Sequence, residues 1–324
     1  MNKIDSIKRM THEMKEIVFL EEKTINELLE KSNGTLDEKE LYRQSRKYWN
    51  ENIETTVETI DGVFDGPYGE ISYRLFYPEG ARNRKDNPGI VFFHGGGFVV
   101  GDLDTHHGIS VHLAEETGAV IASLGYHLVP EYGYPVPLEE GLAFISFIRE
   151  KGYDLHMDPE CISLAGDSAG AQISLGVALM IRDQKKEMPI HSLLLFYGVF
   201  GLRDSMSRRL FGGSWDGLSE ENLEDYENRY IGDDQKDAPY AKLFDWDLTY
   251  GLPPTFLAAC DLDPLLDDSK LLNAIMKENK MDVQLVIYSG VIHGFLHYAK
   301  QLKESREAIL DSTNFFKNRL PKTY

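Results

Sequence analysis

The sequence predicts an α/β fold in which a mostly parallel central sheet is covered by helices on both faces. Short, nearly continuous apolar segments alternate along the chain with amphipathic segments. Strands of a parallel sheet give unbroken apolar runs because neither of their faces meets water. The segments between them carry apolar residues at helical spacing, as helices that pack on a sheet do.

The order of the expected elements follows from this alternation. The expected strands cover residues 55–60, 71–77, 90–93, 120–124, 162–165, 193–196, 255–259 and 285–288. The expected helices on the sheet cover residues 138–150, 169–182, 265–278 and 300–318.

Two stretches fall outside the alternation. Residues 1–50 are charged, with apolar positions at helical spacing and a break at Asn33-Gly34. Residues 198–254 interrupt the pattern and contain a helical piece at 219–230. We therefore expect one domain, 1–324, in which residues of about 1–50 and about 198–245 form a helical cap over the sheet.

Composition excludes several partners. The chain has 324 residues and a formal net charge of -19, with 53 acidic against 34 basic side chains. Such a surface repels phosphate backbones and anionic lipid headgroups, so neither nucleic acid nor a membrane is an expected partner. No segment approaches the ~20 apolar residues of a spanning helix, and the charged first residues do not resemble a signal peptide. Cys161 and Cys260 lie beside apolar segments and are expected as buried free thiols, which favours a cytoplasmic location.

A nucleophile motif follows the expected strand at 162–165. The residues Gly166-Asp167-Ser168-Ala169-Gly170 match G-x-S-x-G, and a helical segment begins directly after them. This elbow places a serine on a sharp turn between strand and helix, where larger neighbours would clash. An ordinary glycine-rich turn is the alternative, and the strand–turn–helix context argues against it. Ser168 is the predicted nucleophile, with Asp167 supporting the motif.

A glycine-rich segment, His94-Gly95-Gly96-Gly97, follows the expected strand at 90–93. Glycines let the backbone approach a substrate, and their N–H groups can stabilise a developing oxyanion. We assign this oxyanion hole to Gly96, Gly97 and the N–H of Ala169, with Gly95 as a fallback and His94 as a supporting residue. A phosphate-binding loop is excluded because no Gly-Lys-Ser/Thr ending and no G-x-G-x-x-G is present.

An acid and a histidine are expected after the serine, in that order. His293 follows the expected strand at 285–288, where it would accept the serine proton. The carboxylate that orients it follows the strand at 255–259, where Asp263 is preferred because Pro264 opens a helix behind it. The competing aspartates are expected to be solvated or capping: Asp261, Asp267 and Asp268.

No metal or cofactor is expected. His106, His107 and His112 form a local group, and His293 with His297 would face one side of a helix, but neither set matches H-E-x-x-H. Asp261 and Asp263 lack the glycine and the terminal glutamate of a calcium loop.

With these motifs together, the sequence resembles the hormone-sensitive-lipase-like branch of the α/β-hydrolase esterases. That branch joins a His-Gly-Gly-Gly segment to a Gly-Asp-Ser-Ala-Gly elbow and takes its acid from an Asp-Pro-Leu segment, as at residues 263–265. More narrowly it resembles the bacterial acetyl esterases, through residues 101–106, 197–205, 208–210 and 215–218. The resemblance runs from about residue 88 to the C-terminus.

One segment departs from the pattern of the branch. The branch often carries Asp-Tyr-Arg-Leu-Ala-Pro-Glu where this chain has Gly125-Tyr126-His127 and residues 128–131. Arginine and histidine are not interchangeable in a buried ion pair, so we expect the contacts of this loop to differ.

The resemblance implies a cofactor-independent esterase for short acyl groups, acetyl above all, acting through an acyl-enzyme. An acetylated carbohydrate is one candidate substrate. The alternatives are an amidase or a longer-chain lipase on the same scaffold, and a non-catalytic ligand-binding relative, against which the presence of His293 argues. A homo-oligomer through an edge strand after the last helix is conceivable from the sequence, but nothing in it requires one.

Overall fold

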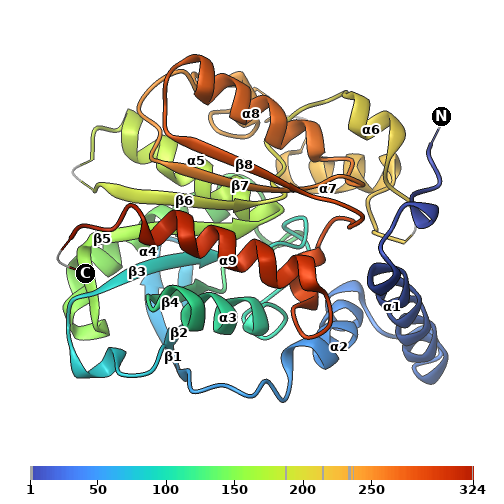
Figure 1. Cartoon of the computed structure of the whole chain (residues 1–324), viewed down its shortest axis with the longest axis horizontal. Coiled ribbons are helices and arrows are strands. Elements are labelled where there is room, and N and C mark those ends of the chain that lie inside the picture. The colour runs from blue at the N-terminus through green and yellow to red at the C-terminus, as the bar shows by residue number, and fades with distance from the viewer. Residues whose placement is uncertain (1–2, 187, 214, 233–234, 236, 323) are drawn as a thin grey trace.

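The computed structural model describes residues 3–186, 188–213, 215–232, 235, 237–322 and 324. Eight strands form one sheet in the order β1-β2-β4-β3-β5-β6-β7-β8 (Figure 1). The first two strands run antiparallel to each other, β2 runs antiparallel to β4, and the other neighbours are parallel. The predicted fold class, a mostly parallel sheet between helices, is confirmed.

The strands lie where the apolar runs predict, with longer ends. They are β1 (Glu58–Gly66), β2 (Gly69–Tyr77), β3 (Asn87–Phe93), β4 (Val120–Leu124), β5 (Met157–Asp167), β6 (Ile190–Phe196), β7 (Thr255–Cys260) and β8 (Val283–Tyr288). Only the first prediction, 55–60, is largely displaced. This edge strand is exposed along most of its length, so its bounds depend on pairing with β2 rather than on an apolar run.

Alternate residues of the strands pack into two apolar cores, one on each face of the sheet. In β3, Val91 and Phe93 belong to the core under α4 (Val136–Lys151), α5 (Ala169–Asp183) and α8 (Leu266–Glu278). Ile90 and Phe92 belong to the opposite core, under α3 (His107–Thr117) and α9 (Lys303–Lys317). Of these helices, only α3 was not predicted; seven of its eleven residues are buried, so it lacks a polar face that would reveal its period.

Four further helices gather at the edge where the parallel strands end (Figure 1). They are α1 (His12–Lys31), α2 (Glu38–Asn50), α6 (Met206–Leu210) and α7 (Glu220–Ile231). The predicted break at Asn33 lies between α1 and α2, where Asn33 adopts a positive φ of 52°. Arg46 of α2 joins the first helix to the main body, because its guanidinium binds both Glu21 and the hydroxyl of Tyr298.

The fold also places the two cysteines, the edges of the sheet and the longest helices. Cys161 and Cys260 are buried and free, as predicted. In the part of the chain that the structure describes, no strand follows α9, so the idea of an edge strand there is wrong; the edges of the sheet are β1 and β8. Among the described residues, no helix has both the length and the apolar character to cross a bilayer.

Candidate active site

Ser168 occupies a strained turn between β5 and α5. Its backbone has φ 52° and ψ -118°, a region that residues with a side chain rarely adopt. The flanking glycines are required by close packing. A Cβ on Gly166 would lie 2.4 Å from the backbone of Gly170, and one on Gly170 would lie 1.9 Å from the carbonyl oxygen of Phe93. The local sequence thus presents the serine hydroxyl at the end of the strand.

Three side chains from separate strand ends form one line of hydrogen bonds. The Oγ atom of Ser168 lies 2.8 Å from Nε2 of His293. The other ring nitrogen of His293, Nδ1, lies 2.8 Å from Oδ2 of Asp263. Asp263 is fully buried, and its second oxygen accepts the N–H of Leu265. This is the geometry in which a histidine can remove a serine proton while a carboxylate fixes its tautomer.

The electrostatics of His293 suit a base. Burial alone would lower its pKa, but the charge and the hydrogen bond of Asp263 outweigh burial and raise the pKa above the ordinary histidine value. Asp263 therefore stabilises the protonated form of this imidazole.

The three competing aspartates have other partners. Asp261 accepts hydrogen bonds from Ser289 and the N–H of Gly290, and Asp267 accepts one from the N–H of Ser207. Asp268 was expected to be solvated or capping, and solvation is wrong. It is fully buried, and burial raises its pKa to about 6. One of its oxygens accepts the N–H groups of residues 200, 201 and 202, which ties α8 to the loop after β6.

The glycine segment after β3 reaches the cavity beside Ser168, which Gly97 also lines. Gly96 and Gly97 have positive φ values of 111° and 61°. The N–H groups of Gly96 and Gly97 have no hydrogen-bond acceptor among the described residues. Ala169 is the first residue of α5, so its N–H has no partner within the helix. The N–H of Gly95, in contrast, donates to Oδ1 of Asp167 at 2.8 Å.

His94 packs against Tyr126 and contacts the backbone of the glycine segment. Its ring stacks on Tyr126 with centroids 4.2 Å apart, and its Nδ1 lies 2.8 Å from the carbonyl oxygen of Gly95. Burial, together with the charge of His106, lowers the pKa of His94 to about 4, so the ring is neutral at physiological pH.

A buried group that sequence reasoning missed lies behind the elbow. One potential ligand atom from each of His106, Asp167 and His297 lies within 4.8 Å of the others. These side chains come from three distant segments, so their meeting depends on the tertiary fold. Histidine and carboxylate side chains are ligands that transition metals bind. In this protein, however, Oδ1 of Asp167 accepts the N–H of Gly95 and lies 3.5 Å from Nε2 of His106. The predicted shared helix face of His293 and His297 is wrong, because Gly294 turns the chain with φ 76° between them.

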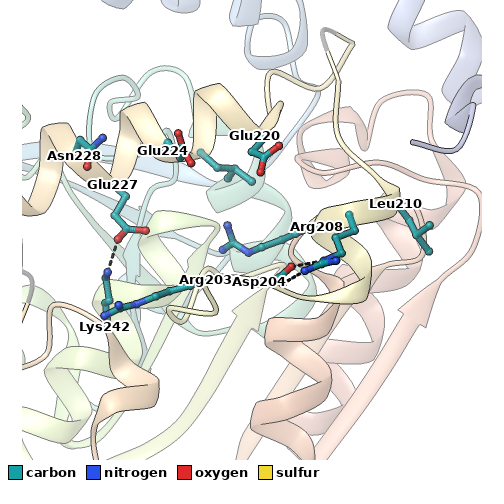
Figure 2. Close-up of a pocket in the computed structure, with 11 residues that line it drawn as sticks. Arg203, Asp204, Arg208, Leu210, Glu220, Glu224, Glu227, Asn228 and Lys242 are labelled. Carbon is teal, nitrogen blue, oxygen red and sulfur yellow. Dashed lines mark hydrogen bonds and ion pairs between the residues drawn. The ribbon is translucent and has the colours of Figure 1, made fainter. Parts of the chain in front are cut away.

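A small inner cavity opens beside Ser168, and a larger outer cavity shares four of its lining residues. The inner cavity, of about 80 Å³, is walled mainly by apolar and aromatic side chains such as Phe98, Val199, Leu218 and Tyr226. This is well below the ~300–1,000 Å³ typical of ligand pockets. The outer cavity, of about 1030 Å³, lies between α6 and α7 and is lined mostly by charged side chains (Figure 2).

The unusual loop at residues 125–131 makes hydrogen bonds to a buried carboxylate. Glu140 of α4 is fully buried, and its two oxygens accept hydrogen bonds from the backbone N–H and from Nδ1 of His127. The imidazole therefore contacts a buried glutamate at the position where the branch often carries arginine.

The fold and the serine–histidine–aspartate geometry define a hydrolase, and comparison with known proteins agrees. The alpha/beta hydrolase fold family matches residues 90–297, and the chain belongs to that family. It also belongs with the family's esterases. Acetyl esterases of Salmonella agona and Salmonella typhi are each 35% identical to it over 98% of both chains. The solved structure of a hyperthermophilic esterase from the archaeon Pyrobaculum calidifontis superposes with a TM-score of 0.84 and 26% identity, covering 96% of this chain and 98% of that one.

Proposed function

We propose that this protein hydrolyses short-chain carboxylic esters, acetyl esters above all, through a triad of Ser168, His293 and Asp263. The observation that carries the proposal is the unbroken line of two 2.8 Å hydrogen bonds from Asp263 through His293 to Ser168. The full-length similarity to acetyl esterases supports the acetyl preference.

The chemical steps follow from the positions of the atoms. Ser168 attacks the ester carbonyl while His293 accepts its proton at Nε2. The carbonyl oxygen becomes an oxyanion, and the N–H groups of Gly96, Gly97 and Ala169 stabilise it. We leave Gly95 out of the hole because its N–H already donates to Asp167. The C–O bond then breaks, and His293 gives its proton to the departing alcohol.

The second half of the cycle reverses these roles. Water attacks the acyl group on Ser168, and His293 accepts a proton from that water. Collapse of the new oxyanion releases the carboxylic acid and returns the proton to Ser168. Atoms balance without a metal or an organic cofactor.

The short-acyl preference is supported by the inner cavity of about 80 Å³. Its apolar wall suits the methyl group of an acetyl, whereas a long chain would collide with side chains such as Leu218 and Tyr226. Helices α1, α2, α6 and α7 are the proposed cap of a single domain. The close packing of α7 on the glycine segment supports this cap. A Cβ atom added to Gly97 would lie only 2.8 Å from the ring of Tyr226.

A series of p-nitrophenyl esters from acetate to octanoate tests the acyl preference. We expect kcat/KM to be highest for acetate and to fall steeply beyond butyrate. Rising activity toward octanoate would instead identify a longer-chain lipase. A fluorophosphonate probe should label the wild-type protein and leave Ser168→Ala unlabelled; a wild-type protein that resists labelling would favour a non-catalytic binding protein.

A further inference from the structure

The outer cavity adjoins the inner cavity that Ser168 lines. Four residues line both cavities: Arg208, Leu223, Glu227 and Lys242. Figure 2 shows Arg208 reaching from α6 into the space that α7 bounds, while Lys242 contacts Glu227 at the opposite end. An ester with its carbonyl at Ser168 and its acyl group in the inner cavity would direct its alcohol half past Arg208 toward the outer one.

The Arg208 side chain is nearly buried, and most of its hydrogen-bond donors have no partner among the described residues. Its side chain is only 15% exposed, and its Nε is buried without a hydrogen-bond partner among the described residues. Its nearest charge, Oδ2 of Asp268, is 3.8 Å from Nη2, which is beyond hydrogen-bond range. A guanidinium offers five donors in a rigid fork, and leaving them unsatisfied in a buried position is costly. Figure 2 shows the guanidinium reaching into the space beside α7.

The other side chains that line the outer cavity determine which class of alcohol fits it. Of the eleven lining residues only Leu210 and Leu223 are apolar, and the charged ones carry both signs. Glu220 and Glu224 have no ion pair or hydrogen bond within the described parts of the chain, so their oxygens are free to accept. A hydrocarbon group would remove these charges from water without compensation. The lining holds four carboxylates and four basic side chains, so its formal charges cancel and favour neither an anionic nor a cationic group.

We propose that the outer cavity is a binding site for a neutral, polyhydroxylated alcohol half, with Arg208 donating to hydroxyl oxygens next to the ester. The carboxylates of α7 would accept hydrogen bonds from other hydroxyls of the same group. The inference rests on the proposed esterase function and adds to it the class of alcohol that leaves with the proton of His293.

A matched pair of acetates tests the substrate class. Methyl 6-O-acetyl-glucopyranoside and cyclohexylmethyl acetate are both acetates of a primary alcohol attached to a six-membered ring, and the hydroxyl groups are the main difference. We expect kcat/KM of the wild-type enzyme to favour the glucoside by at least about tenfold, because a site built for hydroxyls rejects an analogue without them. Equal or better turnover of the cyclohexyl ester would overturn the proposal.

The role of Arg208 is tested by Arg208→Gln and Arg208→Lys. Each variant should lower the glucoside-to-cyclohexyl ratio about tenfold, mainly through KM for the glucoside. Because the ratio compares two substrates on one enzyme preparation, partial unfolding cancels, and the lysine variant keeps a positive charge near Asp268. Arg229→Gln is the control. Arg229 belongs to α7 and pairs with Glu38 and Asp225, but it lines neither cavity.

The outcomes separate this inference from the proposed function. Equal losses on both acetates in the Arg208 variants would assign Arg208 a purely structural role and overturn the subsite. A control that loses selectivity as strongly as the Arg208 variants would overturn it as well. If p-nitrophenyl acetate is not hydrolysed either, the esterase proposal itself fails. If that ester is hydrolysed while the wild-type enzyme shows no preference for the glucoside, only the subsite fails.

Discussion

Oδ1 of Asp167 accepts a 2.8 Å hydrogen bond from the backbone N–H of Gly95. This contact joins the two motifs on which the proposed chemistry depends, because Asp167 precedes Ser168 and Gly95 opens the segment with Gly96 and Gly97. Burial raises the pKa of Asp167, but His106 and the N–H of Gly95 more than offset that, so the group stays ionised. The elbow and the glycine segment are thereby held in one geometry.

Replacing Asp167 with alanine should therefore reduce turnover while Ser168 and His293 stay in place. Loss of the acceptor leaves the N–H of Gly95 buried without a partner, at a cost of about 1–3 kcal/mol, and frees the loop to move. We expect kcat for p-nitrophenyl acetate to fall about tenfold or more, with slower fluorophosphonate labelling. A circular dichroism spectrum like that of the wild-type protein is the control for folding. Unchanged kcat would show that this hydrogen bond does not position the loop.

A methyl group on Gly96 should disable the proposed oxyanion hole. The residue has φ 111°, and a Cβ there would lie 2.2 Å from the carbonyl oxygen of Val100. We predict that Gly96→Ala lowers kcat by roughly 10²–10³-fold, the usual effect of losing one oxyanion donor. The matched control is Gly118→Ala, at φ 70° with nothing within 4 Å of the added Cβ. It should cost about 1–2 kcal/mol of stability and leave kcat unchanged.

The pH profile should reflect the raised pKa of His293. The base must be neutral to accept the proton of Ser168, so kcat/KM is lost as pH falls through that pKa. Because Asp263 raises the pKa, the midpoint of the acid limb should lie above the ordinary value of about 6.5.

The Asp263→Asn variant checks the cause of that shift. Without the carboxylate, burial dominates and lowers the pKa of His293, so the acid limb should move to lower pH while kcat falls by about 10⁴-fold. An acid limb that stays in place in this variant would contradict the assignment of Asp263.

The contact of His127 with Glu140 should contribute to stability rather than to turnover. His127→Ala would leave one oxygen of a fully buried carboxylate without its partner. We expect the free energy of unfolding to drop by about 1–3 kcal/mol, measured as a lower urea midpoint at constant slope, with kcat retained. His12→Ala is the control, since His12 pairs only with Glu16 on the surface of α1. Equal midpoints for the two variants would show that the buried contact carries no stability.

The sequence predicted the fold class because apolar runs report burial directly, as in Val120–Leu124, where the predicted and observed bounds coincide. Motif order likewise indicated which side chains meet at the ends of β5, β7 and β8. The sequence could not predict contacts that depend on long-range packing. Asp268 resembles a surface residue of α8 until the loop after β6 buries it, and no local pattern links His106 with His297.

Turnover by Ser168→Ala tests whether Ser168 is the nucleophile. We predict that this variant, folded and with His293 intact, hydrolyses p-nitrophenyl acetate at no more than a trace of the wild-type rate, since the oxyanion donors alone supply only a small residual catalysis. Hydrolysis of p-nitrophenyl acetate by Ser168→Ala at a substantial fraction of the wild-type rate would contradict it, because the nucleophile would then lie elsewhere.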